Sequence, residues 1–525
     1  MFLTIHLFIY LSLFFSLISV ADCRSPIPSG GRQFAFSWVD FCRKPVIISN
    51  APSFWGLIFE IRSVKITKKN ALDMTQGPLA KQILAFSIPL MLTNLLQVLF
   101  NMSDIAVLGQ FAGDNPLGSV GSTSTLVYLF TGFLIGLGSG VNVLCARYFG
   151  ARDEKNLSET IHSSILVCLA MGIFVMIVGE AFSGAFLRLL NTKDELMDGA
   201  KLYMDIYFLG APAVALYNYG SGVLSAVGDT RRPLVYLAIS GVLNIVLNII
   251  FVVVFGMDVD GVAIASVVSQ YLSMVLIFLP LTRGIDICKL SWRKIRPYAS
   301  KIKSTLALGL PAGLQHAIFA IANLFIQAGI NSFDASVVSG NSAASNVDSI
   351  IYNVVNAFYM AAASFVGQNY GAGNKKRVRQ SFWISVAFAF GTALVLGIVA
   401  ALFGRSFLRI FSESDAVIDA GMYRVVILGL SYCISVFMDL PIAASRGLGK
   451  TLVPTVCVIL GSCVFRVIWL YTVFAWFGTL TSLYMLYVFS WALTSLAETL
   501  YFIHCYRHAS FEHAATDAVL EGAAT

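Results

Sequence analysis

The sequence predicts an all-α membrane protein with twelve transmembrane helices in two six-helix lobes, related by a pseudo-twofold axis along the membrane normal. Three observations predict this fold: an apolar composition, twelve long apolar segments and an internal repeat. Of the 525 residues, 57% are apolar and only 12% are charged, and the mean hydropathy is +0.79. Soluble domains carry about 25% charged residues. The composition therefore excludes an aqueous enzyme, a nucleic-acid-binding protein and a disordered protein.

Twelve segments are long and apolar enough to cross a bilayer, which takes about 20 residues of helix. We expect them at residues 83–108, 118–145, 160–181, 200–226, 233–255, 261–282, 305–330, 338–367, 380–403, 420–445, 453–477 and 481–506. Several contain Asn, Ser, Gly or Pro, which is common in helices that line a cavity.

The distribution of basic residues predicts the orientation of these segments. Loops after even-numbered segments carry 18 Lys and Arg residues, whereas loops after odd-numbered segments carry five. Because basic loops stay on the cytoplasmic side, we expect the even loops and both ends of the twelve-helix unit in the cytoplasm. The net charge of +7 then records topology, and no nucleic-acid partner is expected.

The expected organisation has five parts. A leader, residues 1–73, precedes a first lobe at 74–282, a cytoplasmic linker at 283–304, a second lobe at 305–508 and a tail at 509–525. The leader has an apolar run at residues 2–21 and basic residues after it. It fits a cleaved signal peptide, an extra span or an upstream stretch before a start at Met74; we favour the last and assign it no function.

Three separate loops repeat at one constant spacing of 221 residues. YFGARDEKNL from Tyr148 resembles NYGAGNKKRV from Asn369, and FLRLLNTKDE from Phe186 resembles FLRIFSESDA from Phe407. Gly228, Thr230 and Pro233 match Gly449, Thr451 and Pro454, while Pro89 and Pro311 lie 222 apart. Each repeat holds six spans, so both halves have the same orientation. Two such bundles around a shared cavity indicate an alternating-access transporter.

These residues resemble the MATE (multidrug and toxic compound extrusion) family, of the bacterial type, over about residues 74–508. The motifs are MTQGP, FNMSDIAVLG, the YFGAR and NYGAG loops, AVGDTRRP, RGLGKTLVP and CVFRVIW. The resemblance implies efflux of organic, often cationic, compounds driven by H⁺ or Na⁺ across the cell membrane. It implies no enzyme activity and no cofactor apart from the coupling ion. We expect small organic substrates and the lipid bilayer as partners, and a functional monomer.

A small set of polar residues in the first lobe is expected to couple transport to the cation. Asp104 is surrounded by apolar residues in the first span, where a charge is costly unless it is neutralised or paired. It matches the functional aspartate that the family has on its first helix. Asn244 and Asn248 lie one turn apart on one helix face, where many members have an Asp at the second position. Ser266 resembles a hydroxyl residue of the family. Packing of the asparagines by interhelical hydrogen bonds is the alternative.

The second lobe offers weaker candidates. Some family members have an acid in span seven, where this chain has Gln315 and Asn323 instead; this favours H⁺ over Na⁺. Asp439 and Arg466 are expected either to pair and switch partners during transport or to form a fixed packing pair. Asp348 begins span eight and faces either the cavity or the outer water.

Other chemistries are not supported by the sequence. No P-loop, CxxC pair, metal-ligand cluster or nucleophile–base arrangement occurs among the 525 residues, so neither a catalytic site nor a metal site is expected. The alternative function within the same superfamily is a flippase for a lipid-linked oligosaccharide. Such a protein should hold pyrophosphate with cationic side chains in its cavity.

Overall fold

The computed structural model describes residues 72–190, 192–283 and 288–511. All of them belong to one compact unit, residues 66–525. The expectations for residues 1–71 of the leader and 512–525 of the tail lie outside the described residues.

The first lobe consists of long helices. They are α4 (Leu79–Phe111), α5 (Asp114–Gly150), α6 (Glu154–Leu189), α7 (Asp194–Phe208), α8 (Ala211–Ala226), α9 (Arg231–Ile249), the π-helix η2 (Ile250–Val254) and α10 (Val259–Arg283). A short 3₁₀ turn, η4 (Trp292–Lys294), precedes the second lobe.

The second lobe repeats this order. Its helices are α11 (Ala299–Ile330), α12 (Ala335–Gly371), α13 (Lys375–Leu408), α14 (Asp415–Gly447), α15 (Leu452–Val458), the π-helix η5 (Ile459–Val464), α16 (Phe465–Trp469), the π-helix η6 (Leu470–Phe474), α17 (Ala475–Phe477) and α18 (Leu480–His508). The all-α fold and the segments expected in it are confirmed: 11 helices in the described part of the chain are long and apolar enough to cross a membrane.

The fourth segment differs from the expectation, because it is divided into α7 and α8. The amides of Leu209 and Gly210 bond to carbonyls three residues back instead of four, and Pro212 stands in the first turn of α8. Proline lacks the amide that would continue the helical ladder and tolerates only the first turn of a helix. The backbone therefore restarts at this point.

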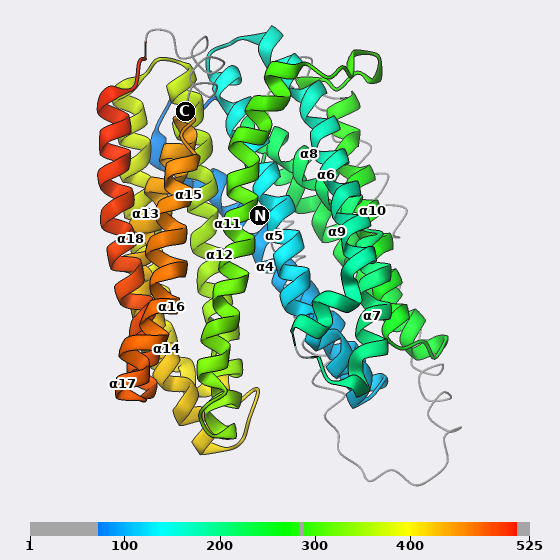
Figure 1. Cartoon of the computed structure of the whole chain (residues 1–525). Coiled ribbons are helices and arrows are strands. Elements are labelled where there is room, and N and C mark those ends of the chain that lie inside the picture. The colour runs from blue at the N-terminus through cyan, green and yellow to red at the C-terminus, as the bar shows by residue number, and fades with distance from the viewer. Residues whose placement is uncertain (1–71, 191, 284–287, 512–525) are drawn as a thin grey trace, which may run out of the picture. The chain divides into compact units, whose positions relative to one another are not determined.

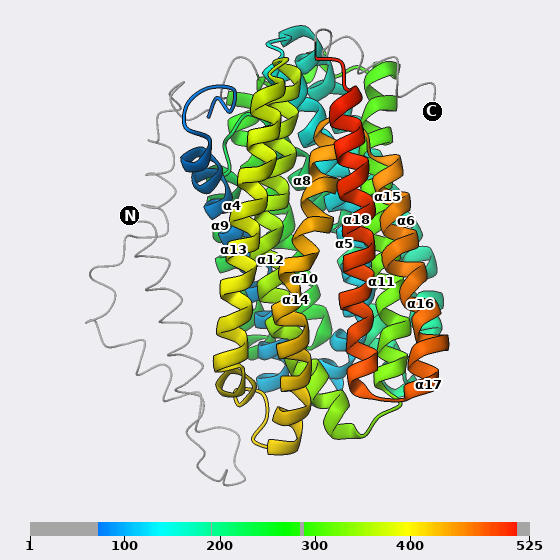
Figure 2. The ribbon, with the colours of Figure 1, turned by 90° about the vertical axis from the view of Figure 1, so that its left-hand side faces the viewer.

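The helices pack into two lobes that meet along α4, α5, α11 and α12. In the first lobe α5 packs against α6, α7 and α8, and α9 packs against α4 and α10; in the second, α14 packs against α12, α13 and α18. Between the lobes, α5 contacts α11 and α12, and α4 contacts α12. Figure 1 shows the first-lobe helices on one side and α12–α18 on the other, and Figure 2 shows the second-lobe helices in front.

The turn between α5 and α6 has the same form as the turn between α12 and α13. Asp153 accepts a hydrogen bond from the Asn156 amide at 3.0 Å, and Asn374 accepts one from the Arg377 amide at 3.1 Å. Arg152 and Gly373, the residues before these caps, both have positive φ, 55° and 71°. Burial opposes ionisation of Asp153, but hydrogen bonds from Asn156 and nearby lysines outweigh it, so the pKa of the Asp153 carboxyl is lowered. The repeat of the sequence is thus a repeat of structure.

The lobes close on each other at the end that carries the basic loops. A Cβ on Gly150 would meet the carbonyl of Gln368, and a Cβ on Gly371 would meet the carbonyl of Arg147. These contacts are the same contact made twice, since each pair of positions is 221 apart. Gln368 also donates to the carbonyl of Ala226 at 2.6 Å. Glycine at both positions lets the two helix ends touch, backbone to backbone.

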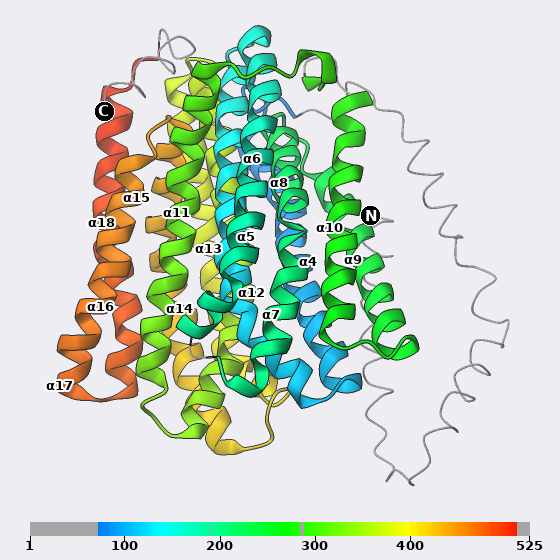
Figure 3. The same cartoon turned by 45° about the vertical axis from the view of Figure 1, so that its right-hand side comes forward.

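Two further groups of hydrogen bonds join the lobes at this end. Lys301 of α11, which is 1% exposed, donates to Tyr148 Oη at 2.9 Å and to Asn156 Oδ1 at 2.5 Å. Arg377 of α13 donates to the backbone carbonyls of Met74, Gln76 and Gly77, in the segment that leads into α4. Figure 3 shows α11 beside α5 and α6.

Lys301 and Arg446 correct one detail of the sequence analysis. The count of basic residues that predicts the orientation treats both as loop residues, but the structure places both inside helices, buried at 1% and 4% exposure. Both positive charges are used inside the protein, so they carry less information about topology than the exposed loop residues do.

Candidate functional site

A cluster of polar side chains lies inside the first lobe, where α4, α9 and α10 meet. Asp104 is 7% exposed and accepts hydrogen bonds from Asn248 Nδ2 at 2.5 Å and from Ser266 Oγ at 3.1 Å. Asn244 Nδ2 donates to Ser266 Oγ at 3.3 Å, and Asn248 Nδ2 also reaches Asn244 Oδ1 at 3.4 Å. The structure thus brings together all four residues expected to form the coupling site.

Local structure explains how these side chains converge. Asn244 and Asn248 are one turn apart on α9, so both project from one face. The π-helix η2 follows directly and ends the regular α9 ladder. Such π-turns are rare and often occur at functional sites.

The cluster holds a carboxylate without a positive partner. Within the described ranges, no Lys, Arg or His forms an ion pair with Asp104. Asn248 Oδ1 is buried and has no hydrogen-bond donor. Tyr203 and Tyr207 of α7 lie close enough to interact electrostatically with Asp104. The donors around the carboxylate are neutral, which leaves oxygen atoms able to take up a proton or a small cation.

In the second lobe, Asp348 is engaged in an ion pair that the sequence analysis did not identify. Arg424 Nε lies 2.6 Å from Asp348 Oδ2, and Arg424 Nη1 donates to Asn341 Oδ1 at 2.6 Å. Tyr484 Oη donates to the same Asn341 oxygen at 3.1 Å. Arg424 falls inside the predicted span 420–445, so a basic residue in an apolar segment was the signal that could have found it.

Asp439 and Arg466 are not brought together. The cation that acts on Asp439 is Arg446, two turns further along the same helix α14. Arg446 in turn donates to Gln315 Oε1 at 2.6 Å and to Tyr359. Glu498 lies near Arg446 and Asp439 and is fully buried, with neither carboxylate oxygen hydrogen-bonded. The expected Asp439–Arg466 pair is therefore wrong, because a cation on the same helix face takes Arg466's place.

The remaining candidates lie in different surroundings. Arg466 donates from Nε to Ser490 Oγ at 3.0 Å and lies over the rings of Tyr487, Trp491 and Phe319. Asn323 is exposed on α11 and makes no hydrogen bond to another described residue. The second lobe thus holds two separate charged groups, one around Arg424 and one around Arg446.

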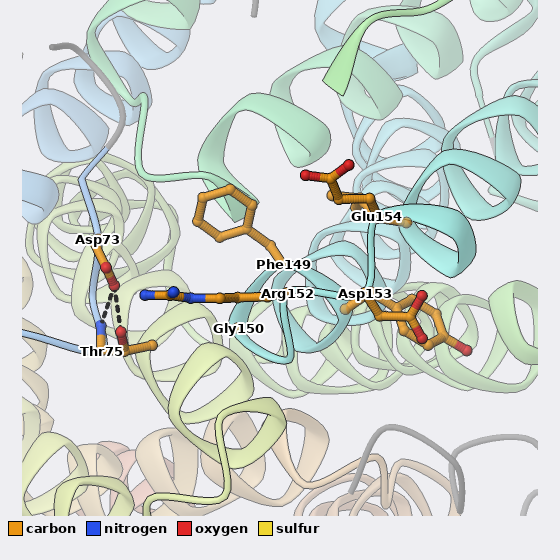
Figure 4. Close-up of a pocket in the computed structure, with 9 residues that line it drawn as sticks. Asp73, Thr75, Phe149, Gly150, Arg152, Asp153 and Glu154 are labelled. Atoms are coloured by element: carbon orange, nitrogen blue, oxygen red, sulfur yellow. Dashed lines mark hydrogen bonds between the residues drawn. The ribbon is translucent and has the colours of Figure 1, made fainter. Parts of the chain in front are cut away.

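A cavity of about 320 Å³ lies at the α5–α6 turn, away from the first-lobe cluster. Figure 4 shows Arg152 extending across it toward Asp73 and Thr75, with Asp153 and Glu154 on the opposite side. None of the candidate coupling residues lines this cavity. It belongs to the closed end of the lobes, and we do not assign transport chemistry to it.

No group of three or more His, Cys, Asp or Glu side chains able to hold a metal ion occurs among residues 72–190, 192–283 and 288–511. The seven cysteines in these ranges are unpaired.

Comparison with known proteins gives consistent matches. A family model described as MatE matches the chain twice, at residues 89–250 and 311–472. The chain is 31% identical over 361 residues to the probable multidrug resistance protein YpnP of Bacillus subtilis (strain 168), covering 67% of this chain and 79% of that one. It is 25% identical over 405 residues to the probable multidrug resistance protein NorM of Thermotoga maritima, covering 74% and 84%.

The fold has counterparts among solved structures. A structure described as the outward-facing conformation of a multidrug resistance MATE family transporter of the MOP superfamily matches with a TM-score of 0.78 and 23% identity. The match covers 84% of this chain and 99% of that one. The twofold family match coincides with the internal repeat, and the expected two-lobe fold is confirmed. The chain therefore belongs to the MATE family of multi-pass membrane transporters.

Proposed function

We propose that the chain is a secondary active antiporter of the cell membrane. It exports small amphipathic, often cationic, organic compounds in exchange for H⁺, or for Na⁺, by alternating access. The observation that carries this proposal is the buried Asp104 carboxylate, which has neutral donors around it and no basic partner. The names of the similar multidrug resistance proteins support the exporter role.

The first-lobe cluster suits a coupling ion that binds and leaves. A carboxylate inside a membrane protein is costly when charged and unpaired. A proton on Asp104, or a sodium ion among Asp104, Asn248 Oδ1 and Ser266, removes that cost while the site is closed to water. Since the ion and the exported compound bias the same moving lobes, their binding is antagonistic and reciprocal.

The hydrogen bonds between the lobes support a definite place for this structure in the cycle. With the basic loops in the cytoplasm, the contacts of Lys301, Gln368 and Arg377 lie at the cytoplasmic end. This arrangement is then the state closed to the cytoplasm. Transport requires these contacts to break and the opposite end to close.

The test is ethidium efflux from drug-sensitive cells or energised inverted vesicles. Wild type is compared with Asp104→Asn, and with Asp198→Asn as a matched control, because Asp198 is an exposed carboxylate of the same lobe. We expect Asp104→Asn to abolish efflux and Asp198→Asn to keep it. The proton and sodium gradients are collapsed separately, and the gradient whose loss stops efflux identifies the coupling ion.

A second candidate function is the flipping of a lipid-linked oligosaccharide. Three buried arginines of the second lobe, Arg424, Arg446 and Arg466, favour it, because such a lipid carries pyrophosphate. If wild-type protein, shown to be in the membrane, exports no cationic dye under any gradient, the antiporter proposal fails and the flippase is preferred.

A further inference from the structure

The second lobe carries an arginine where the first lobe carries Asn244. Pro233 and Pro454 are 221 residues apart, but Gly256 and Gly478, which end the following helices with positive φ, are 222 apart. A π-turn inserts one residue into an α-helix. The first lobe has one π-helix here, η2, and the second has two, η5 and η6. Because η5 precedes Arg466, the spacing at Arg466 is 222, which aligns Arg466 with Asn244.

The same register exchanges the charges of the two lobes. Pro89 and Pro311 are 222 apart within α4 and α11, so Asp104 aligns with Ile326. The carboxylate of the first lobe is thus replaced by an aliphatic side chain, and an amide is replaced by a guanidinium. One place in the repeat holds a negative charge in one lobe and a positive charge in the other.

Arg466 has no acidic partner. It is 3% exposed, and no ion pair to it occurs in the described part of the chain. Asp348, the acid of the neighbouring group, gives Oδ2 to Arg424 and leaves Oδ1 without a partner. Only Nε of Arg466 is hydrogen-bonded within the described residues, to Ser490. The guanidinium stays charged at any working pH, and such a charge inside a membrane protein marks a functional site by default.

Aromatic rings surround this guanidinium. Its Cζ lies 4.5 Å from the ring centre of Tyr487, 5.9 Å from that of Trp491 and 5.8 Å from that of Phe319. These rings come from α18 and α11, on both sides of the guanidinium. Cation–π contacts lower the cost of the charge, but they leave both terminal nitrogens available to an acceptor.

We propose that Arg466 binds an acidic group, a carboxylate or a phosphate, of an aromatic guest. The planar guanidinium matches both groups with two parallel hydrogen bonds, and Tyr487 and Trp491 offer faces on which an aromatic ring stacks. This inference rests on the proposed export function. It extends the range of exported compounds to those that carry an acidic group.

The first test measures binding without transport. Tryptophan fluorescence of the purified protein is titrated with phenyl phosphate and with benzoate, and Trp491→Phe identifies the part of the signal that comes from the site. We expect Arg466→Gln to weaken binding about tenfold or more, as the loss of a charged hydrogen-bond donor requires. Arg405→Gln is the matched control, since Arg405 is an exposed arginine at a helix end and should bind as wild type does.

The second test separates binding from a structural role. Export of an anionic aromatic dye and of ethidium is measured in proteoliposomes. Arg466→Gln should raise KM for the anionic dye about tenfold and change KM for ethidium less than twofold. Equal losses for both dyes, or unchanged binding of phenyl phosphate, would overturn the proposal. If Arg466→Gln does not fold, Arg466→Lys replaces it; it keeps the charge, loses the planar fork and should weaken binding of the anionic probe alone.

A third measurement identifies the source of the acidic group. Movement of a fluorescent anionic lipid between leaflets is compared in wild type and Arg466→Gln. Faster movement in wild type supports the site with a lipid headgroup as guest; loss of dye export alone supports it with a soluble guest. Loss of ethidium export in wild type, with phenyl phosphate still bound, contradicts the antiporter and leaves the anion site standing.

Discussion

Arg152 is held in a backbone conformation that its side chain disfavours. Its φ of 55° is in the left-handed region, where a Cβ comes too close to the carbonyl oxygen, at a cost of about 1–2 kcal/mol. The second lobe has Gly373 at the same place in the repeat, with φ 71°. The turn requires this conformation, and only one of its two copies has the residue that adopts it freely.

Arg152→Gly should therefore stabilise the protein, by about 1 kcal/mol in the free energy of unfolding. The measurement is thermal unfolding in detergent. Arg152→Ala is the control, because it removes the charge and keeps the Cβ. A gain of the same size in Arg152→Ala would show that the charge near Asp153 and Glu154 matters, and not the backbone.

Asp104 shows how far single residues could be interpreted from the sequence. Its role was predictable because an acid in an apolar span is conspicuous, and Asn244 and Asn248 at helical spacing indicated a shared face. Its contact with Ser266, on another helix, follows only from the packing of α4, α9 and α10. The pairing of Asp439 could not be predicted, since sequence does not tell which of three basic side chains a helix face will meet.

At the scale of elements, the two lobes depend on a close crossing of α5 and α11. A Cβ on Gly136 would lie 2.3 Å from the backbone nitrogen of Gly313, and one on Gly140 would lie 2.5 Å from that of Gly309. Contacts this short require glycine on both helices, as small residues permit close helix approach in membranes. The crossing joins the lobes, so it also favours the arrangement in which the basic end is closed.

Gly136→Ala should lower the thermal unfolding temperature and reduce efflux, because overpacking of a tight contact costs about 1–3 kcal/mol. Gly391→Ala on α13 is the matched control, since a Cβ there meets nothing within 4 Å. Equal stability and efflux in the two variants would mean that the α5–α11 crossing can separate without cost.

The boundaries of the elements were less predictable than their number. Helix α5 begins at Asp114 and ends at Gly150, several residues beyond the predicted 118–145 at each end. Apolar composition marks only the part of a helix inside the hydrocarbon, whereas the helix continues into polar surroundings until a turn such as Arg152–Asp153 ends it. The division of the fourth segment at Gly210 was marked by Gly and Pro in the sequence, which the apolar count passed over.

At the scale of the whole molecule, Lys301 is a buried cation that links the lobes. Its ammonium group bonds to Tyr148 and Asn156 of the other lobe and lies 4.3 Å from the ring centre of Tyr148. Hydrogen bonds from a charged group contribute about 1.5–3 kcal/mol each. Their loss should shift the equilibrium toward the state open at the basic end about tenfold or more.

Lys301→Met tests this expectation. Spin labels at Lys155 and Lys376, exposed positions 221 residues apart, report the distance between the lobes. The variant should populate longer distances than wild type, and Lys303→Met, which removes an exposed charge from the same helix, should not. An unchanged distance distribution in Lys301→Met would assign closure of this end to the glycine contacts alone.

The broken fourth segment gives the two lobes different stiffness. Helices α7 and α8 together span residues 194–226, and their counterpart α14 spans 415–447 as one rod, although it contains Pro441. At Leu209 and Gly210 the ladder of hydrogen bonds is interrupted, so a bending load meets less resistance there than in α14. When the surrounding bilayer thins or thickens, the first lobe is the half that yields, and the second transmits the strain as a lever.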